Sequence, residues 1–210
     1  MRLTVHVVAH VDRINDAADL AHDLAPATIH LDDGRLGTYA NHRRALAAAA
    51  ATDATHAVVL EDDALPIPGF LEHAHHAIAR RPEHLIGLYV GTGHPRLVQS
   101  EIAETITTAG PFLTLPRQST LRWGVGTIYP VADLVHVIAT ADRLSAIAAD
   151  RRLGAWHGAQ DRIVYTWPSL VDHADLAQVT PEHGRRLAPR RAWRVGAPEW
   201  AESTDATPGG

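Results

Sequence analysis

The chain has 210 residues, 46% of them hydrophobic, which suffices to bury the core of one domain, or of one domain with a tail. It contains no Cys, which excludes disulfides, thiolate metal sites and a cysteine nucleophile. The formal net charge of −5 does not favour binding of nucleic acid over the whole surface. All 19 basic residues are Arg, so a phosphate contact must come from Arg, His, backbone amides or a metal.

The first ninety residues alternate between strand and helix patterns. Strands are predicted where short apolar or β-branched runs occur, and helices where apolar residues recur every three or four positions. In chain order the predicted strands are 3–9, 28–31, 57–60 and 85–90, and the helices between them are 15–24, 38–51 and 69–80. This alternation predicts an α/β domain with a mostly parallel sheet flanked by helices. Ligands of such sheets bind at the carboxyl ends of the strands.

The second half of the chain has a less regular pattern. Helices are predicted over 97–108, 131–149 and 158–167, and short strands over 112–115, 123–129 and 170–171. From residue 176 the chain is polar, first rich in Arg and then without apolar periodicity. We therefore predict a domain over residues 1–175 and a tail over residues 176–210, basic at first and then disordered.

The sequence also predicts where the protein works. No apolar run approaches the roughly 18 to 20 residues of a membrane-spanning helix, and residues 1–9 do not have the pattern of a signal peptide. We expect a cytoplasmic protein without a membrane span. The excess of Ala and Arg over Lys is typical of GC-rich genomes, such as those of actinobacteria and their phages.

Three consecutive carboxylates, Glu61, Asp62 and Asp63, follow the apolar run 57–60. Adjacent carboxylates repel one another unless a cation offsets their charge. Mg²⁺ or Mn²⁺ is often shared between one or two carboxylates and the phosphates of a substrate. The cluster therefore predicts a divalent metal site at the end of this strand. The alternatives are a solvated loop, or a role for Asp63 in capping the next helix.

The run Val58 to Ala64, which contains Leu-Glu-Asp-Asp-Ala, resembles the acid-x-acid motif of glycosyltransferases with the A-type fold. It is similar to the form found in lipopolysaccharide-type and collagen-type galactosyltransferases. The resemblance implies the A-type, Rossmann-like fold of nucleotide-diphospho-sugar transferases. It also implies that Glu61 and Asp62 lie near the ribose and diphosphate, and that Asp63 binds Mn²⁺ or Mg²⁺.

The end of the first predicted strand agrees with this resemblance. In that fold the first strand ends at the nucleotide, and here it ends in Ala9-His10-Val11-Asp12-Arg13. The resemblance implies that His10 faces the base and that Arg13 contacts a phosphate. Ordinary polarity of a surface loop is the alternative for both residues.

The second predicted strand and the helix after it supply two further candidates. The strand ends in Asp32-Asp33, where such enzymes hold the base or ribose, and we take Asp33 as a donor-binding residue. The segment 37–44 resembles their Gly-then-Asn helix beside the donor site, which implies that Asn41 binds the donor. Thr38, in the same segment, is also a suitable helix N-cap.

A candidate catalytic base lies further along the chain. Ala159-Gln160-Asp161 resembles the x-acid-Asp element, whose final Asp is the base of inverting members. Gln160 departs from the family pattern, which often has Glu there. A base must reach the acceptor hydroxyl, and Asp161 is predicted to do so at the start of the helix 158–167. Its alternative role is to stabilise that helix N-terminus through the dipole.

The second candidate metal ligand is His173. It follows Asp161 by twelve residues and ends the segment 167–173, which resembles the one that ends in the metal-binding His of many A-type members. A carboxylate and an imidazole with open positions suit Mn²⁺ at least as well as Mg²⁺. Because the chain has 15 His residues, an ordinary surface His is the alternative.

Together these patterns predict a metal-dependent glycosyltransferase that moves a sugar from a nucleotide-diphospho-sugar to an acceptor hydroxyl. Inversion is the predicted outcome, and retention is the alternative, because the sequence does not fix which face of the sugar the acceptor attacks. The resemblance favours a uridine diphosphate donor and leaves the acceptor open between a glycan, a small molecule and a modified base in DNA. One alternative is a nucleotidyltransferase, for which the sequence lacks Lys and a basic Gly-rich loop. The other is a non-catalytic nucleotide-sugar-binding module with the same fold. The sequence does not set the oligomeric state.

Overall fold

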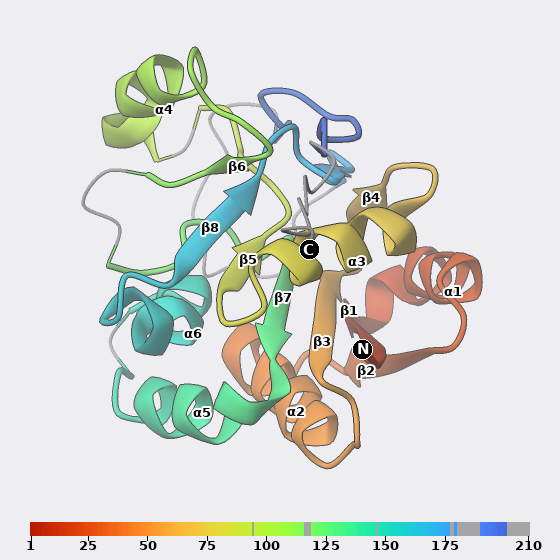
Figure 1. The fold of residues 1–210 in the computed structure, drawn as a ribbon. Coiled ribbons are helices and arrows are strands. Elements are labelled where there is room, and N and C mark those ends of the chain that lie inside the picture. The colour runs from red at the N-terminus through yellow and green to blue at the C-terminus, as the bar shows by residue number, and fades with distance from the viewer. Residues whose placement is uncertain (94, 116–118, 146, 177–178, 180–189, 201–210) are drawn as a thin grey trace, which may run out of the picture.

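The computed structural model describes residues 1–93, 95–115, 119–145, 147–176, 179 and 190–200. A seven-stranded sheet with the order β2-β1-β3-β7-β5-β8-β6 forms its centre and is flanked by helices (Figure 1). The strands are β1 Leu3–His10, β2 Ala27–Asp32, β3 His56–Glu61, β4 Ala64–Pro66, β5 Leu85–Gly87, β6 Phe112–Leu113, β7 Gly126–Pro130, β8 Ile163–Thr166 and β9 Val171–His173. The α-helices are α1 Ile14–Asp23, α2 Thr38–Ala50, α3 Phe70–Arg80, α4 Gln99–Thr105, α5 Leu134–Asp142 and α6 Ala149–Gly158.

The strand directions confirm the predicted mostly parallel α/β fold. Strands β1, β2, β3, β5 and β8 run one way, whereas β7 and β6 run the other way. The carboxyl ends of β1, β2 and β3 therefore meet at one edge of the sheet. Within the described residues no helix is both long and apolar enough to cross a membrane.

The core lies on both faces of the central strands. The four residues of β3 from Ala57 to Leu60 have no exposed surface, and Val7 of β1 beside them has none either. A continuous apolar run of this kind is typical of a strand that is covered on both faces. Three of the helices, α2, α5 and α6, contact one another as well as the sheet region. The rigid sheet thus fixes the positions of the loops at its carboxyl edge.

Two predicted helices in the second half of the chain are wrong. The predicted helix 131–149 is interrupted after Asp142, where α5 ends, and α6 begins only at Ala149. The predicted helix 158–167 is instead the end of α6 followed by the buried strand β8, whose residues Ile163 to Thr166 are β-branched or aromatic. Such residues favour a strand where they can pair with neighbouring strands, and β8 pairs with β5 and β6.

Residues 190–200 of the predicted tail contact the domain. Isolated bridges join Gly91 to Ala192 and Ser169 to Val195, and the Trp193 amide donates to the carbonyl oxygen of Val90 at 2.9 Å. The boundary at residue 175 stays a prediction. The expected disorder of residues 204–210 lies outside the described residues.

Two buried histidines on neighbouring strands form a hydrogen-bonded pair. His6 Nδ1 lies 2.9 Å from His30 Nε2, and His6 Nε2 lies 3.1 Å from the Thr4 hydroxyl. Burial, with smaller contributions from the charges of His6 and Arg44, lowers the pKa of His30 to about 4. Burial also lowers the pKa of His6. The fold therefore holds this pair in its neutral form.

We expect the free energy of unfolding to decrease as the pH falls from about 6.5 to about 4. The folded-state pKa of His30 lies below the unfolded value, so the unfolded chain binds the extra proton in this window. The loss from His30 alone is on the order of 2–3 kcal/mol. Urea unfolding at several pH values measures it. His30→Gln should flatten the profile, whereas the exposed control His22→Gln should keep the wild-type slope; parallel profiles for wild type and His30→Gln would contradict this assignment.

Candidate functional site

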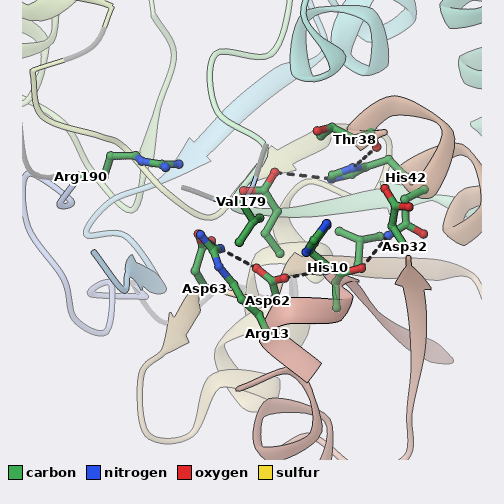
Figure 2. A pocket seen from close by; sticks show the side chains of 13 residues that line it. His10, Arg13, Asp32, Thr38, His42, Asp62, Asp63, Val179 and Arg190 are labelled. Carbon is green, nitrogen blue, oxygen red and sulfur yellow. Dashed lines mark hydrogen bonds and ion pairs between the residues drawn. The ribbon is translucent and has the colours of Figure 1, made fainter. Parts of the chain in front are cut away.

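A hollow of about 90 Å³ lies where the carboxyl ends of β1, β2 and β3 meet (Figure 2). Side chains from these strand ends, from α2 and from the C-terminal segment line it. Of the predicted site residues, those that line the hollow are His10, Arg13, Asn41, Glu61, Asp62 and Asp63. The sequence thus located most of the polar side chains of this pocket, while Asp33 and Asp161 lie elsewhere.

Arg13 forms two ion pairs with the acidic cluster. Its Nη1 atom lies 2.8 Å from Asp62 Oδ1 and 2.6 Å from Asp63 Oδ2, and all three side chains are less than 10% exposed. Figure 2 shows the guanidinium pointing at the two carboxylates. The His10 amide also donates to Asp62 Oδ2 at 2.8 Å. Arg13 and the end of β1 therefore hold the carboxylates in place, and the Arg13 side chain is already engaged.

The surroundings of the cluster disfavour the ionised forms of two of its carboxyl groups. Burial, reinforced by the charges of Asp63, Asp62 and Asp150 and opposed by Arg190, raises the pKa of Glu61 to about 8. Burial likewise raises the pKa of Asp62 in spite of its hydrogen bonds from His10 and Arg13. A cation bound beside these groups would favour their ionised forms.

Asp63 and His173 are brought together by a short two-stranded ribbon. Strands β4 and β9 pair with Ala64 opposite His173, and the Ala174 amide donates to the carbonyl oxygen of Asp63 at 2.7 Å. As a result His173 Nε2 lies 3.5 Å from Asp63 Oδ2, and both side chains are almost fully buried. The two predicted metal ligands, 110 positions apart in the sequence, share one site.

The orientation of these two side chains suits a divalent metal. His173 Nδ1 lies 2.8 Å from the carbonyl oxygen of Ala174 and must donate to it. Nε2 lies 3.0 Å from Arg190 Nη1, a donor, so Nε2 accepts there and carries a lone pair that a metal could use instead. Asp63 Oδ1 is buried and has no hydrogen-bond partner among the described residues. Those residues contain no group of three or more His, Asp or Glu that could hold a metal. Two protein ligands with the other positions left to phosphates and water is the arrangement that Mg²⁺ commonly uses.

Asn41 has a structural position at the rim of the hollow. Its side-chain amide donates to the carbonyl oxygens of Ala9 at 3.2 Å and His30 at 2.8 Å, and it thereby ties β1 to β2. Its Oδ1 accepts from Arg44 at 2.8 Å. The next residue, His42, faces the acidic cluster instead.

His42 is a pocket residue that sequence reasoning missed. It is 5% exposed, and its Nδ1 lies 3.0 Å from the carbonyl oxygen of Thr38. Its Nε2 lies 3.7 Å from Glu61 Oε1 and has no hydrogen-bond partner among the described residues. Burial lowers its pKa, so the imidazole is neutral and presents one nitrogen to the pocket. The sequence could have indicated His42 as a pocket residue, because it follows Asn41 on a helix that begins at the pocket.

At the end of β2, Asp32 rather than Asp33 belongs to the hollow. Asp32 is buried and accepts hydrogen bonds of 2.9 to 3.0 Å from four successive backbone amides, those of residues 34 to 37. Burial acts to raise its pKa, but these four donors outweigh that effect and lower it. The Asp33 side chain is 59% exposed, and its Oδ2 atom lies 3.6 Å from Arg35 Nε. Asp32 therefore shapes the loop that leads into α2, and Asp33 points to solvent.

Asp161 is not near the acidic cluster. It follows α6 and precedes β8, which runs parallel to β5, so it lies at the amino edge of the sheet. It adopts a left-handed backbone conformation with φ of 53° where the chain turns out of α6. The sequence placed it at the start of a helix, but it follows the end of one. The structure thus does not position Asp161 to act on a ligand of the hollow.

Asp150, in the first turn of α6, is the carboxylate that the structure places beside the cluster. A side-chain carbon at Gly124 would lie 3.0 Å from Glu61 Oε1 and 3.7 Å from the Asp150 Cβ, so both acids border this glycine. The eleven positions from Asp150 to Asp161 correspond to about 16 Å along a helix. Recognising residues 163–166 as a strand would have placed the start of the preceding helix, and hence Asp150, at the carboxyl edge.

Comparison with known proteins adds little to this site. No model of a protein family matches the chain, and no curated protein matches it. A solved structure that is similar is mannose-1-phosphate geranyltransferase from Thermus thermophilus, with 11% sequence identity and a TM-score of 0.43 over 79% of this chain and 74% of that chain. A likeness this distant carries no argument about function. The assignment therefore depends on the residues of this chain, and the resemblance to galactosyltransferases stays a prediction.

We expect Asp32→Asn to destabilise the protein by about 1–3 kcal/mol, because the substitution replaces the Oδ2 acceptor of the Gly37 amide by an NH₂ donor and removes the charge that strengthens the other three hydrogen bonds. Asp33→Asn is the matched control, and an exposed substitution of this kind should change stability by no more than about 0.5 kcal/mol. Urea unfolding at pH 7 measures both values. Equal stabilities of the two variants would show that the four amides do not depend on the Asp32 carboxylate.

Proposed function

We propose that the protein is a metal-dependent glycosyltransferase that transfers a sugar from a nucleotide-diphospho-sugar to an acceptor hydroxyl. The observation that supports it most directly is the buried pair of Asp63 and His173 beside an excess of carboxylates at the carboxyl edge of the sheet. These two residues would hold Mn²⁺ or Mg²⁺. When bound, the metal would neutralise the charge that develops on the leaving diphosphate.

The remaining residues of the pocket have complementary tasks in this proposal. Glu61 and Asp62 follow β3 and would border the ribose and diphosphate, while Arg13 keeps Asp62 and Asp63 in position through its ion pairs. The loop fixed by Asp32 and the imidazole of His42 form the wall on the side of α2. These groups are held by backbone and buried contacts, so we expect them to keep their positions when a ligand binds.

Asp150 takes the place of Asp161 as the proposed general base. Its Cβ atom borders the same glycine as the Glu61 carboxylate, and its charge contributes to the raised pKa of Glu61, so Asp150 lies on the side of the sheet where the donor would bind. It would accept the proton of the acceptor hydroxyl as the oxygen attacks the anomeric carbon. Attack on the face opposite the diphosphate gives inversion. The acceptor stays open between a glycan, a small molecule and a modified base in DNA, and uridine diphosphate is the proposed leaving group.

A non-catalytic module that only binds a nucleotide-sugar would use the same pocket. Slow hydrolysis of the donor in the absence of acceptor separates the two functions, because water can replace the acceptor in a transferase but a binding module does not break the bond. A nucleotidyltransferase has less support, since the pocket contains no Lys for triphosphate chemistry.

Removal of either proposed metal ligand should abolish metal-dependent activity. For Asp63→Asn and for His173→Ala we expect kcat/KM for hydrolysis or transfer of a uridine diphosphate sugar to fall by at least about 100-fold. Mn²⁺ binding, measured by electron paramagnetic resonance, should weaken in parallel. His75→Ala, on α3 outside the pocket, is the control for loss of a histidine. Full activity and full Mn²⁺ binding in both ligand variants would refute the site.

The choice between the two candidate bases can be tested by a matched pair of substitutions. Asp150→Asn should lower kcat by about 10²- to 10⁴-fold while the KM for the donor changes little, because the base acts on the acceptor. Asp161→Asn should leave both constants near the wild-type values. Steady-state kinetics with a saturating donor measure these effects. The reverse outcome would return the catalytic role to Asp161.

A further inference from the structure

The segment that carries Arg190 is fastened to the domain beside His173. The Arg190 amide donates to Asp175 Oδ1 at 3.0 Å, and the Ala192 amide donates to Asp172 Oδ1 at 2.8 Å. Asp172 and Asp175 lie on either side of His173 and Ala174 in the sequence. Both anchors use the backbone of the segment, so the position of Arg190 does not depend on its own side chain.

Further contacts hold the segment on its other side. Thr92 donates through its amide and hydroxyl to the carbonyl oxygen of Arg191, at 2.8 and 3.0 Å. The Trp193 indole donates to Gln99 Oε1 at 2.9 Å. The Ser169 amide donates to the backbone carbonyl oxygen of Arg194 at 2.9 Å. These hydrogen bonds therefore fix the segment against this edge of the domain.

The side chain of Arg190 lines the hollow together with the acidic cluster (Figure 2). Its Nη1 atom lies 3.0 Å from His173 Nε2, the nitrogen that would bind the metal. Among the described residues it forms no ion pair with a carboxylate. Arg190 interacts with Glu61 only through the charges of the two side chains, without a direct ion pair, and the hydrogen bond that its side chain forms is the contact with His173.

The contact between Arg190 and His173 cannot persist with a metal on the same nitrogen. The Nε2 lone pair accepts one partner, either the guanidinium or the ion. The hollow has a volume of about 90 Å³, and Arg190 is among the side chains that line it. Arg13 is bound to two carboxylates, which leaves Arg190 as the guanidinium that can turn to an anionic ligand.

We propose that Arg190 is a diphosphate-binding residue of this site, which contacts His173 when no metal is bound and the phosphates of the ligand when the imidazole holds the metal. This inference rests on the proposed function and adds to it a residue from the C-terminal segment. A guanidinium suits the task because its planar donors can form two charge-assisted hydrogen bonds to one phosphate.

Calorimetric titrations with uridine diphosphate and with inorganic pyrophosphate, each in the presence of Mn²⁺, test the proposal. For Arg190→Gln we expect both ligands to bind at least about 10-fold more weakly, the loss that a charged hydrogen bond implies. Arg190→Lys keeps the charge and should retain part of the affinity. Arg191→Gln is the matched control, because this neighbour is 57% exposed and points to Asp172. Mn²⁺ alone should bind Arg190→Gln at least as tightly as wild type, since no guanidinium then competes for His173.

The outcomes separate this inference from the proposed function. Equal diphosphate affinities in wild type and Arg190→Gln, with sugar transfer intact, would overturn the inference alone, and so would equal affinities in the Lys and Gln variants. Pyrophosphate binding that depends on Arg190, in a protein that neither hydrolyses nor transfers a nucleotide-sugar, would support the inference and overturn the proposed function. A wild-type protein that binds neither diphosphate would overturn both.

Discussion

The repulsion among carboxylates at the end of β3 is the constraint on which the rest of the site depends. Glu61, Asp62 and Asp63 leave a buried strand together, and α6 adds Asp150 beside them. One arginine from the end of β1 offsets part of this charge through two short ion pairs. Burial and the neighbouring carboxylates together raise the pKa of Glu61, so the ionised form of this side chain is disfavoured here. A site of this kind is stabilised by a bound cation and, through it, by an anionic ligand.

The cations around the cluster differ in how firmly they are held. Arg13 is buried and bound to two carboxylates, so its release would leave charges unpaired in the interior. Within the described residues, the Arg190 guanidinium has a hydrogen-bond contact with the His173 imidazole and no direct ion pair, and its segment is anchored by backbone hydrogen bonds. If the proposed metal and ligand bind, Arg190 would therefore move at lower cost than Arg13. This difference is the physical basis of the task that we propose for the C-terminal segment in ligand binding.

The strands and helices of the first half of the chain were predictable because each has a hydrophobic periodicity that is contained within its own residues. Alternating apolar runs and helical stripes specify strands and helices one by one, and parallel strands bring their carboxyl ends to one edge. The second half was harder. Residues 163–166 form a strand that pairs with β5 and β6, where the sequence predicted a helix. Asp161 was chosen as the base by its resemblance to a short motif, and that resemblance did not indicate that Asp161 lies at the amino edge of the sheet. Similarly, only the turn after β2 decides that Asp32 faces inward and Asp33 outward.

By itself the sequence determined the α/β fold, the acidic cluster and its position after a buried strand. These features depend on hydrophobic periodicity and charge among residues that are close together in the sequence. The tertiary structure alone decided which distant side chains meet. The ribbon of β4 and β9 sets His173 against Asp63, and the hydrogen bonds of the C-terminal segment bring Arg190 to the same imidazole. Such contacts join positions separated by most of the chain. They depend on strand pairing and loop anchoring in three dimensions, which no local pattern specifies.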